Sequence, residues 1–178
     1  MQTINTLLLM IIPLVVAGVL HMVVVNRDYF SSLKQPINIQ QFGKNKTYRG
    51  FIIMPLAAAF TAALLMPLIK PSLFIFTPSA ASGFYIGLIL AISYLLFELP
   101  NSFLKRRLGI PPGGHPQKYR RFFYWADQLD SAIGVMLGAF IILHLPLAFC
   151  FLACAIHPLI AITVKKCLHT FRLKETAY

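Results

Sequence analysis

Acidic residues are scarce in this chain. It contains five Asp and Glu against 16 Lys and Arg, which gives a formal net charge of +11. Two of the five acids, Asp127 and Asp130, nevertheless stand three apart and follow a stretch rich in Lys and Arg. A charge this positive can indicate nucleic-acid binding or attraction to anionic lipid headgroups. The basic stretches are short loops and match no common nucleic-acid-binding domain, so we expect no nucleic-acid partner.

Long apolar runs dominate the rest of the sequence. Hydrophobic residues make up 58% of it and the mean hydropathy is +0.73, far outside the range of soluble proteins. A helix needs about 17 to 25 apolar residues to cross the hydrocarbon layer, and five such runs lie at residues 4–25, 51–69, 81–99, 126–145 and 147–164. We therefore predict an all-α integral membrane bundle of about five transmembrane helices, in which the first run is retained and not cleaved as a signal peptide.

Cysteines are few, and internal repeats are lacking. The three cysteines cannot make a secreted disulfide framework, and Cys150 and Cys154 are expected to pack inside the last span. No repeat or low-complexity linker divides the sequence, so residues 1–178 are predicted to form a single transmembrane domain. Five short spans with charges only at one edge offer no midplane site or inverted repeat, which disfavours a transporter.

The basic residues are distributed unevenly between the predicted loops. All Lys and Arg except Lys70 fall in the stretches 26–50, 101–125 and 165–178. Lys and Arg concentrate in cytoplasmic loops near the ends of membrane helices. With five spans, this predicts an outside N-terminus, a cytoplasmic C-terminus and one basic, functional face toward the cytoplasm at the cytoplasmic (inner) membrane.

Three acidic side chains, Glu98, Asp127 and Asp130, lie at the edges of predicted spans on that face, where charge is costly and usually marks function. Residues three apart share a helix face, and two carboxylates that close repel unless a cation lies between them or one is protonated. Mg²⁺ is the natural cation, because one or two carboxylates hold it together with substrate phosphates. The alternatives are an ion pair of the aspartates with Arg120 and Arg121 at a helix start, and capping or snorkelling for Glu98.

Two basic segments share this predicted face with the acid pair. Lys105, Arg106 and Arg107 follow the third span; Arg suits bidentate phosphate contacts and Lys supplies a point charge, although topology alone also favours such a cluster. The second segment, GKNKTYRG at residues 43–50, has two glycines that let backbone amides approach an anion. Its candidate ligands are Lys44, Lys46, Thr47 and Arg49. The combination predicts a site for a magnesium nucleoside triphosphate and a lipid phosphate.

These motifs resemble those of the CDP-archaeol synthase family of membrane CTP-transferases. SFLKRRLG at residues 102–109, followed by Pro112, Gly113 and DQLD at 127–130, is similar to one family motif, and GKNKTYRG is similar to the family's GK-x-K-T-[WY]-R-G loop. The likeness extends from about residue 26 to the LKE at 173–175. Glu98 stands where the family commonly has Asp. The more distant phosphatidate cytidylyltransferases share the S-x-x-K-R element, but their Lys-Asp pair after it is missing here.

The resemblance implies a CTP-dependent cytidylyltransferase of phospholipid biosynthesis. It would move a cytidylyl group from CTP to a lipid phosphate, phosphatidate-like or ether-linked, release pyrophosphate and require Mg²⁺. In this interpretation Lys105, Asp127 and Asp130 are catalytic, and Glu98 joins the two aspartates as a metal ligand. The expected substrate-binding residues are Lys44, Lys46, Thr47, Arg49, Ser102, Lys105, Arg106 and Arg107. The competing hypothesis is a non-enzymatic scaffold or lipid-binding protein whose basic face meets anionic lipids; neither hypothesis fixes an oligomeric state.

Overall fold

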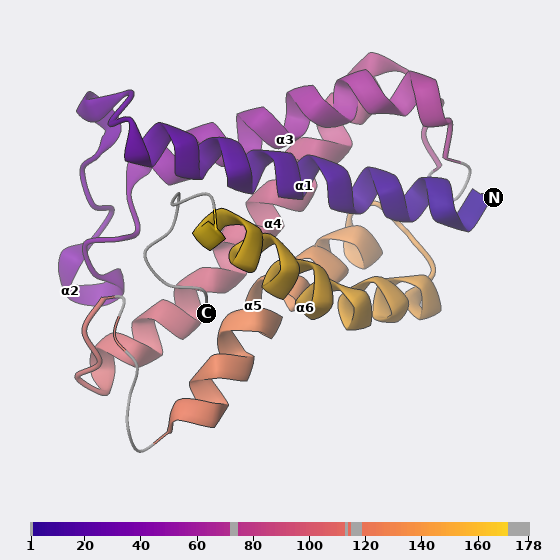
Figure 1. The fold of residues 1–178 in the computed structure, drawn as a ribbon. Coiled ribbons are helices and arrows are strands. Elements are labelled where there is room, and N and C mark those ends of the chain that lie inside the picture. The colour runs from indigo at the N-terminus through magenta and orange to yellow at the C-terminus, as the bar shows by residue number, and fades with distance from the viewer. Residues whose placement is uncertain (1, 72–74, 113, 115–118, 171–178) are drawn as a thin grey trace.

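Five long helices and two short ones form the part of the chain that the computed structural model describes, residues 2–71, 75–112, 114 and 119–170 (Figure 1). Their order is α1 (Gln2–Asn26), η1 (Ser31–Leu33), α2 (Ile39–Phe42), α3 (Tyr48–Ile69), α4 (Ala80–Arg107), α5 (Arg120–Ile141) and α6 (Leu147–Thr170). Within the described ranges no β-strand forms, and a single antiparallel bridge joins Pro36 to Thr47. The predicted all-α class is confirmed. Gly113, Lys118 and the LKE at 173–175 lie outside the described residues.

Four of the long helices, α1, α3, α4 and α6, are long and apolar enough to cross a membrane. They cover the predicted spans 4–25, 51–69, 81–99 and 147–164. The remaining predicted span, 126–145, corresponds to α5, which ends earlier and carries two Arg and two Asp in its first half. α5 and α6 are joined by the tight connection 142–146, where His144 adopts a φ of 54°. The helices fit the predicted membrane bundle, and its orientation stays a prediction.

Helix α4 is about two turns longer than the sequence predicted. It begins at a capping box in which Ser79 and Ser82 bond each other's backbone N–H groups, and it continues through Pro100 to Arg107. Its last turn contains Lys105, Arg106 and Arg107, where positive charge complements the negative end of the helix dipole. The basic motif is therefore helical, and it shares one rigid element with Glu98.

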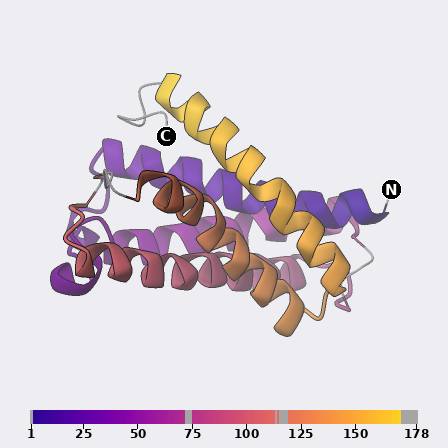
Figure 2. The same ribbon diagram turned by 90° about the horizontal axis from the view of Figure 1, so that it is seen from below.

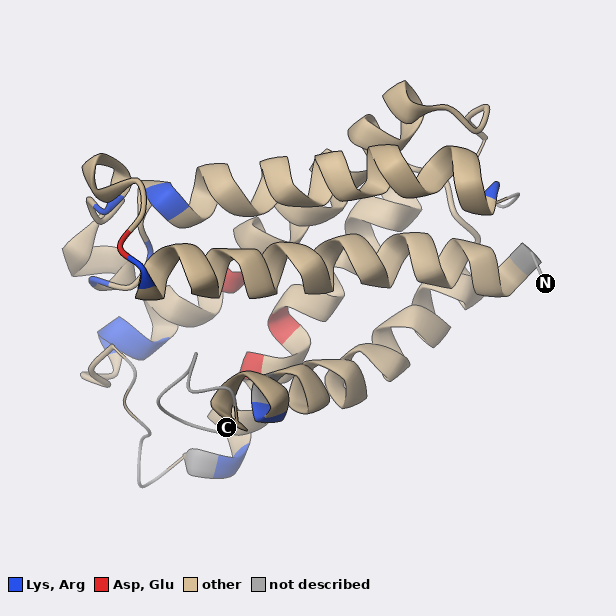
Figure 3. Ribbon diagram, turned by 45° about the horizontal axis from the view of Figure 1, so that its top comes forward, with Lys and Arg blue, Asp and Glu red and all other residues tan. Residues whose placement is uncertain are grey.

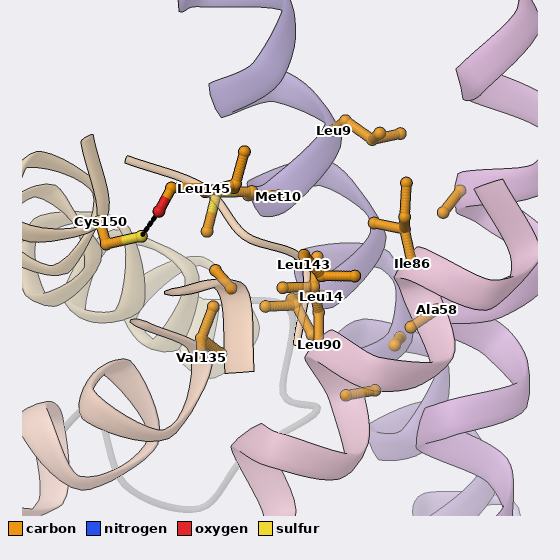
Figure 4. Packing of buried hydrophobic residues seen from close by; sticks show 14 of the residues in the cluster. Leu9, Met10, Leu14, Ala58, Ile86, Leu90, Val135, Leu143, Leu145 and Cys150 are labelled. Carbon is orange, nitrogen blue, oxygen red and sulfur yellow. Dashed lines mark hydrogen bonds between the residues drawn. The ribbon is translucent and has the colours of Figure 1, made fainter. Parts of the chain in front are cut away.

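Small residues let α4 approach its neighbours closely on two sides. A Cβ at Gly87 would lie 2.5 Å from the carbonyl oxygen of Ala58 in α3, and a Cβ at Gly134 of α5 would lie 2.4 Å from that of Ser93. Close packing of small residues is how helices associate in a bilayer. Around these crossings lies a buried apolar cluster to which α1, α4 and α5 contribute, including Leu9, Leu14, Ile86, Leu90 and Val135 (Figure 4).

The charged residues gather at one end of the bundle, where α1 and α4 end and α3 and α5 begin. Figure 3 shows the Lys and Arg of the described residues concentrated there and Lys70 at the other end of α3. Viewed from below, α5 and α6 cross the other helices obliquely (Figure 2). The sequence prediction that the basic stretches share one face agrees with this arrangement for the residues described.

Candidate functional site

Asp127 and Asp130 of α5 face α4, where a single amide joins them. Nδ2 of Asn101 donates hydrogen bonds to Oδ1 of Asp127 at 2.6 Å and to Oδ2 of Asp130 at 2.8 Å. The two carboxylates share a helix face as their spacing predicted, and both are partly buried. Because α5 begins at Arg120, they lie about two turns inside the helix and not in its first turn.

Lys105 places a positive charge directly on this pair. Its ammonium group donates to both carboxylate oxygens of Asp127, so the three predicted catalytic residues, Lys105, Asp127 and Asp130, come together. Among the described side chains, the salt-bridge partner of Asp127 is therefore Lys105 of α4. Arg121 is exposed, and the side chain of Arg120 lies outside what the structure describes.

Glu98 lies one turn before Asn101 on the same side of α4 but has its own partner. Its Oε2 accepts a hydrogen bond from the ammonium of Lys46, and both side chains are largely buried. No three His, Cys, Asp or Glu side chains among the described residues come close enough to hold a metal ion together. Glu98 therefore stands beside the aspartate pair and not within it.

The loop at residues 43–50 folds against the end of α4. Gly43 has a φ of 86°, and a Cβ there would lie 2.9 Å from Cγ of Pro112 and 3.4 Å from the Arg106 side chain, so this position requires glycine. Thr47 caps α3 by accepting a hydrogen bond from the Gly50 N–H at 3.4 Å. The loop thereby brings Lys46 and Thr47 to the same end of the bundle as Lys105. Lys44 remains exposed.

Arg106 carries buried donors that lack partners. Its Nε and Nη1 have no hydrogen-bond partner within the described residues, and its side chain lies against Gly43 of the loop. A buried donor left without an acceptor costs about 1 to 3 kcal/mol. These nitrogens are therefore free to donate to an anion between the loop and α4.

Arg49 has a partner set of its own. It is 3% exposed, and its Nη1 donates to Oδ1 of Asp28 and to the carbonyl oxygen of Tyr29, both at 3.0 Å. The hydrogen bonds from Arg49 and Lys34 hold the pKa of the Asp28 carboxyl below its usual value. Arg49 therefore fastens the segment after α1 to the first turn of α3, away from the aspartate pair.

Two further predicted residues lie on other parts of α4. The guanidinium of Arg107 lies over the ring of Phe103, 5.0 Å from its centroid, and both residues are exposed on the outer side of the helix. Ser102 is half-buried next to Asn101. Of the predicted residues on α4, Lys105 therefore contacts α5, whereas Arg107 faces outward.

A cavity of ≈ 320 Å³ is lined by residues of α1, α3, α4, α5 and α6, among them Glu98 of α4 and Ala132 of α5. Most of its wall is apolar, and its polar end is formed by His21, Lys46, Thr47 and Glu98. Sequence reasoning missed His21 because a lone histidine in an apolar run carries no motif. It also missed Asn101, whose role depends on a helix that is distant in sequence.

Comparison with known proteins gives one consistent likeness. A family model described as CarS-like, CDP-archaeol synthase, matches residues 2–178. A CDP-archaeol synthase from Pyrococcus furiosus is 36% identical over 72 residues, and this stretch spans 40% of the chain and 40% of that relative. No solved structure matches.

Proposed function

Because the chain belongs to the CDP-archaeol synthase family, we propose that it is a membrane cytidylyltransferase that moves a cytidylyl group from CTP to a lipid phosphate. The observation that carries this proposal is the cluster at the α4–α5 crossing. There Asn101 joins Asp127 to Asp130 while Lys105 binds Asp127. The same end of α4 carries the unpartnered Nε and Nη1 of Arg106, and Glu98 of α4 lines a largely apolar cavity.

The aspartate pair fits a divalent cation. One oxygen of Asp127 and one of Asp130 converge on the same nitrogen of Asn101, so both carboxylates point toward the same place between α4 and α5. Such hard oxygen ligands suit Mg²⁺, which takes its remaining ligands from water and substrate phosphates. Mg²⁺ bound by Asp127 and Asp130 would supply neutralising charge for a triphosphate.

The triphosphate of CTP is assigned to the end of α4. The ammonium of Lys105 and the unpartnered Nε and Nη1 of Arg106 provide donors there. Guanidinium groups bind phosphates in a bidentate manner, and partial burial strengthens these contacts. The Gly43 backbone lies against Arg106 and allows an anion to approach the loop closely.

The transfer is a single displacement at phosphorus. An oxygen of the lipid phosphate attacks the α-phosphorus of CTP, the bond from that phosphorus to the oxygen bridging the β-phosphorus breaks, and pyrophosphate leaves with the electron pair. The attacking oxygen is already anionic, so no strong general base is required. The contribution of Lys105, Arg106 and the aspartate pair is therefore to position the substrates and balance their charge.

The product, a CDP-lipid, is an activated intermediate of phospholipid biosynthesis. The acceptor is a phosphatidate-like or ether-linked lipid phosphate. The concentration of Lys and Arg at one end of the bundle supports a site facing the cytoplasm at the inner membrane.

Label transfer tests the proposed reaction directly. Purified protein in detergent is incubated with Mg²⁺, phosphatidate or an ether-linked lipid phosphate, and CTP labelled at either the α- or the γ-phosphorus. We expect label from the α-position to enter the lipid fraction and label from the γ-position to appear in pyrophosphate. Phosphatidylcholine, whose phosphate is blocked, serves as the control acceptor. Absence of transfer to every lipid, together with absence of CTP binding, would favour the scaffold hypothesis.

Asn101 gives a prediction that does not depend on turnover. In an Asn101→Ala variant the two carboxylates lose the donor that joins them, so their mutual repulsion increases and a bound Mg²⁺ relieves more of it than in wild type. We expect a lower Tm than wild type in EDTA, a larger rise in Tm on adding Mg²⁺, and activity reduced about 10- to 100-fold, as for other outer-shell metal partners. Ser102→Ala, one residue along α4, is the control for Tm. Equal Mg²⁺ responses of Asn101→Ala and wild type would remove Asn101 from the site.

A further inference from the structure

We propose that the cavity between α1, α3, α4, α5 and α6 binds the lipid acceptor, with its phosphate at Lys46, Thr47 and His21 and a hydrocarbon chain along the apolar wall. This inference rests on the proposed function and divides the site. It assigns the 43–50 loop, at Lys46 and Thr47, to the lipid phosphate. It leaves Lys105 and Arg106 for CTP.

Along its length the cavity changes from a polar end to an apolar wall, as a lipid phosphate changes from its headgroup to its hydrocarbon chain. Its wall is built from apolar side chains of all five helices, among them Leu14, Met54, Val135, Met136, Ile160 and Val164. Met side chains adapt readily to irregular apolar partners. Along α1 the lining extends from Met10 to Met22, about 18 Å of helix, which is comparable to the depth of about 15 Å of one leaflet's hydrocarbon. A nucleoside triphosphate would leave this wall without a matching surface.

The polar end of the cavity offers donors to a phosphate. Nε2 of His21 is buried and has no hydrogen-bond partner within the described residues. A Cβ at position 50 would lie 3.2 Å from that nitrogen, so Gly50 keeps the edge of the imidazole ring clear. Lys46 and the Thr47 hydroxyl line the same end. Glu98 balances Lys46 by its ion pair when no phosphate is bound.

The polar end is also next to the place where transfer would occur. Glu98 lines the cavity, and Asn101 follows it on the same side of α4 at a rise of about 4.5 Å. Asn101 in turn contacts both aspartates. A phosphate held at Lys46 and His21 therefore lies beside the aspartate pair, while its hydrocarbon chain extends away into the bundle.

We place the entrance for a lipid between α1 and α6. Both α1 and α6 line the cavity, and α1 packs mainly against α3 while α6 packs mainly against α5. A lipid can consequently enter between α1 and α6 without separating α4 from α3 or α5, whose crossings are closely packed.

Gly18 allows the cavity to be filled without disturbing its walls. A Cβ at this position meets no atom within 4 Å, and Gly18 lines the cavity. A Gly18→Phe variant should therefore fold and block the space for a hydrocarbon chain. Leu20→Phe is the matched control, because Leu20 lies on the same helix and is exposed on the outside of the bundle.

Photolabelling without CTP tests the site itself. The probe is a phosphatidate with a diazirine in its acyl chain, presented in phosphatidylcholine vesicles that contain the protein. We expect label on cavity residues of α1 and α6 such as Leu14, Ile160 and Val164, at least about 10-fold less label in Gly18→Phe, and wild-type labelling in Leu20→Phe. Unlabelled phosphatidate should compete and additional phosphatidylcholine should not. Labelling confined to outward-facing residues, or unchanged in Gly18→Phe, would overturn the proposal.

A second pair of variants tests the phosphate contact. His21→Ala should require about 10-fold more unlabelled phosphatidate for half-maximal competition, whereas His169→Ala, an exposed histidine in the last turn of α6, should behave as wild type. Equal competition in both variants would remove His21 from the site.

The two proposals fail in different ways. If the cavity is labelled but no lipid receives a cytidylyl group, the proposed lipid site stands and the proposed enzymatic activity is wrong. If the protein transfers cytidylyl groups but the Gly18→Phe variant keeps the wild-type KM for lipid, the enzymatic activity stands and the cavity is not the acceptor site. If both hold, Gly18→Phe raises the KM for lipid and leaves the KM for CTP unchanged.

Discussion

An Asp130→Asn variant should lose at least about 100-fold in cytidylyl transfer, the order of effect seen when one preorganised electrostatic group is removed from an active site. The substitution keeps the size of the side chain and a possible hydrogen bond to Asn101, but it removes one of the two negative charges that would hold the cation. The measurement is the initial rate of label transfer from α-labelled CTP to lipid at saturating Mg²⁺. Asp127→Asn should show a loss of similar size and also free Lys105 from its salt bridge.

Asp28→Asn is the matched control for this substitution. Asp28 is about half exposed and forms ion pairs with Lys34 and Arg49 outside the α4–α5 crossing. The same chemical change there should leave the rate within about twofold of wild type, because Asp28 pairs with Lys34 and Arg49 and makes no contact with the aspartate pair. Near-normal turnover in well-expressed Asp127→Asn and Asp130→Asn proteins would mean that the pair is a structural feature and holds no metal.

A Gly134→Ala variant should be strongly destabilised although it adds a single methyl group. Alanine is favoured over glycine in a helix by about 1 kcal/mol. The new Cβ, however, would lie 2.4 Å from the carbonyl oxygen of Ser93 and 2.6 Å from Cβ of Phe97, both on α4. Overpacking of this kind costs about 3 kcal/mol, which leaves a net loss of about 2 kcal/mol after the gain from alanine. We therefore expect a Tm roughly 4 to 8 °C below wild type in detergent.

The same variant should also lose activity, because Gly134 follows Asp130 by one turn of α5. Moving α5 away from α4 separates Asp130 from Asn101. The control is Gly18→Ala, the same change in a helix where a Cβ meets nothing within 4 Å. Its Tm should be equal to or above that of wild type. A Gly134→Ala protein as stable as Gly18→Ala would show that the close crossing of α4 and α5 is not required.

The sequence predicted the helices well because hydrophobic length is a local property. The apolar runs correspond to α1, α3, α4, α5 and α6, and the shared face of Asp127 and Asp130 followed from helical spacing alone. The end of α4 was misplaced because hydropathy falls at Glu98 and Pro100. Helical hydrogen bonding continues beyond both residues, so the basic motif is part of the helix.

Contacts between distant segments could not be predicted in the same way. The pairing of Lys46 with Glu98 and of Arg49 with Asp28 depends on how α1, α3 and α4 cross. From the sequence, Lys46 and Arg49 were equivalent cations of one loop. In the structure Lys46 lines the cavity and Arg49 is bound to the segment after α1. The helix crossings depend on glycines such as Gly87 and Gly134. The sequence does not reveal their role, because it does not show which residues of the neighbouring helix they contact.

The concentration of Lys and Arg at one end of the bundle has a consequence for the rate of turnover. Both proposed substrates are anions, and so are both products. The electrostatic potential that raises the local concentration of CTP and lipid phosphate also slows the departure of pyrophosphate. Added salt screens both effects, so it should weaken substrate capture at low CTP and hasten product release at saturating CTP. In the cell, rapid hydrolysis of pyrophosphate would then keep this end of the protein clear for the next substrate.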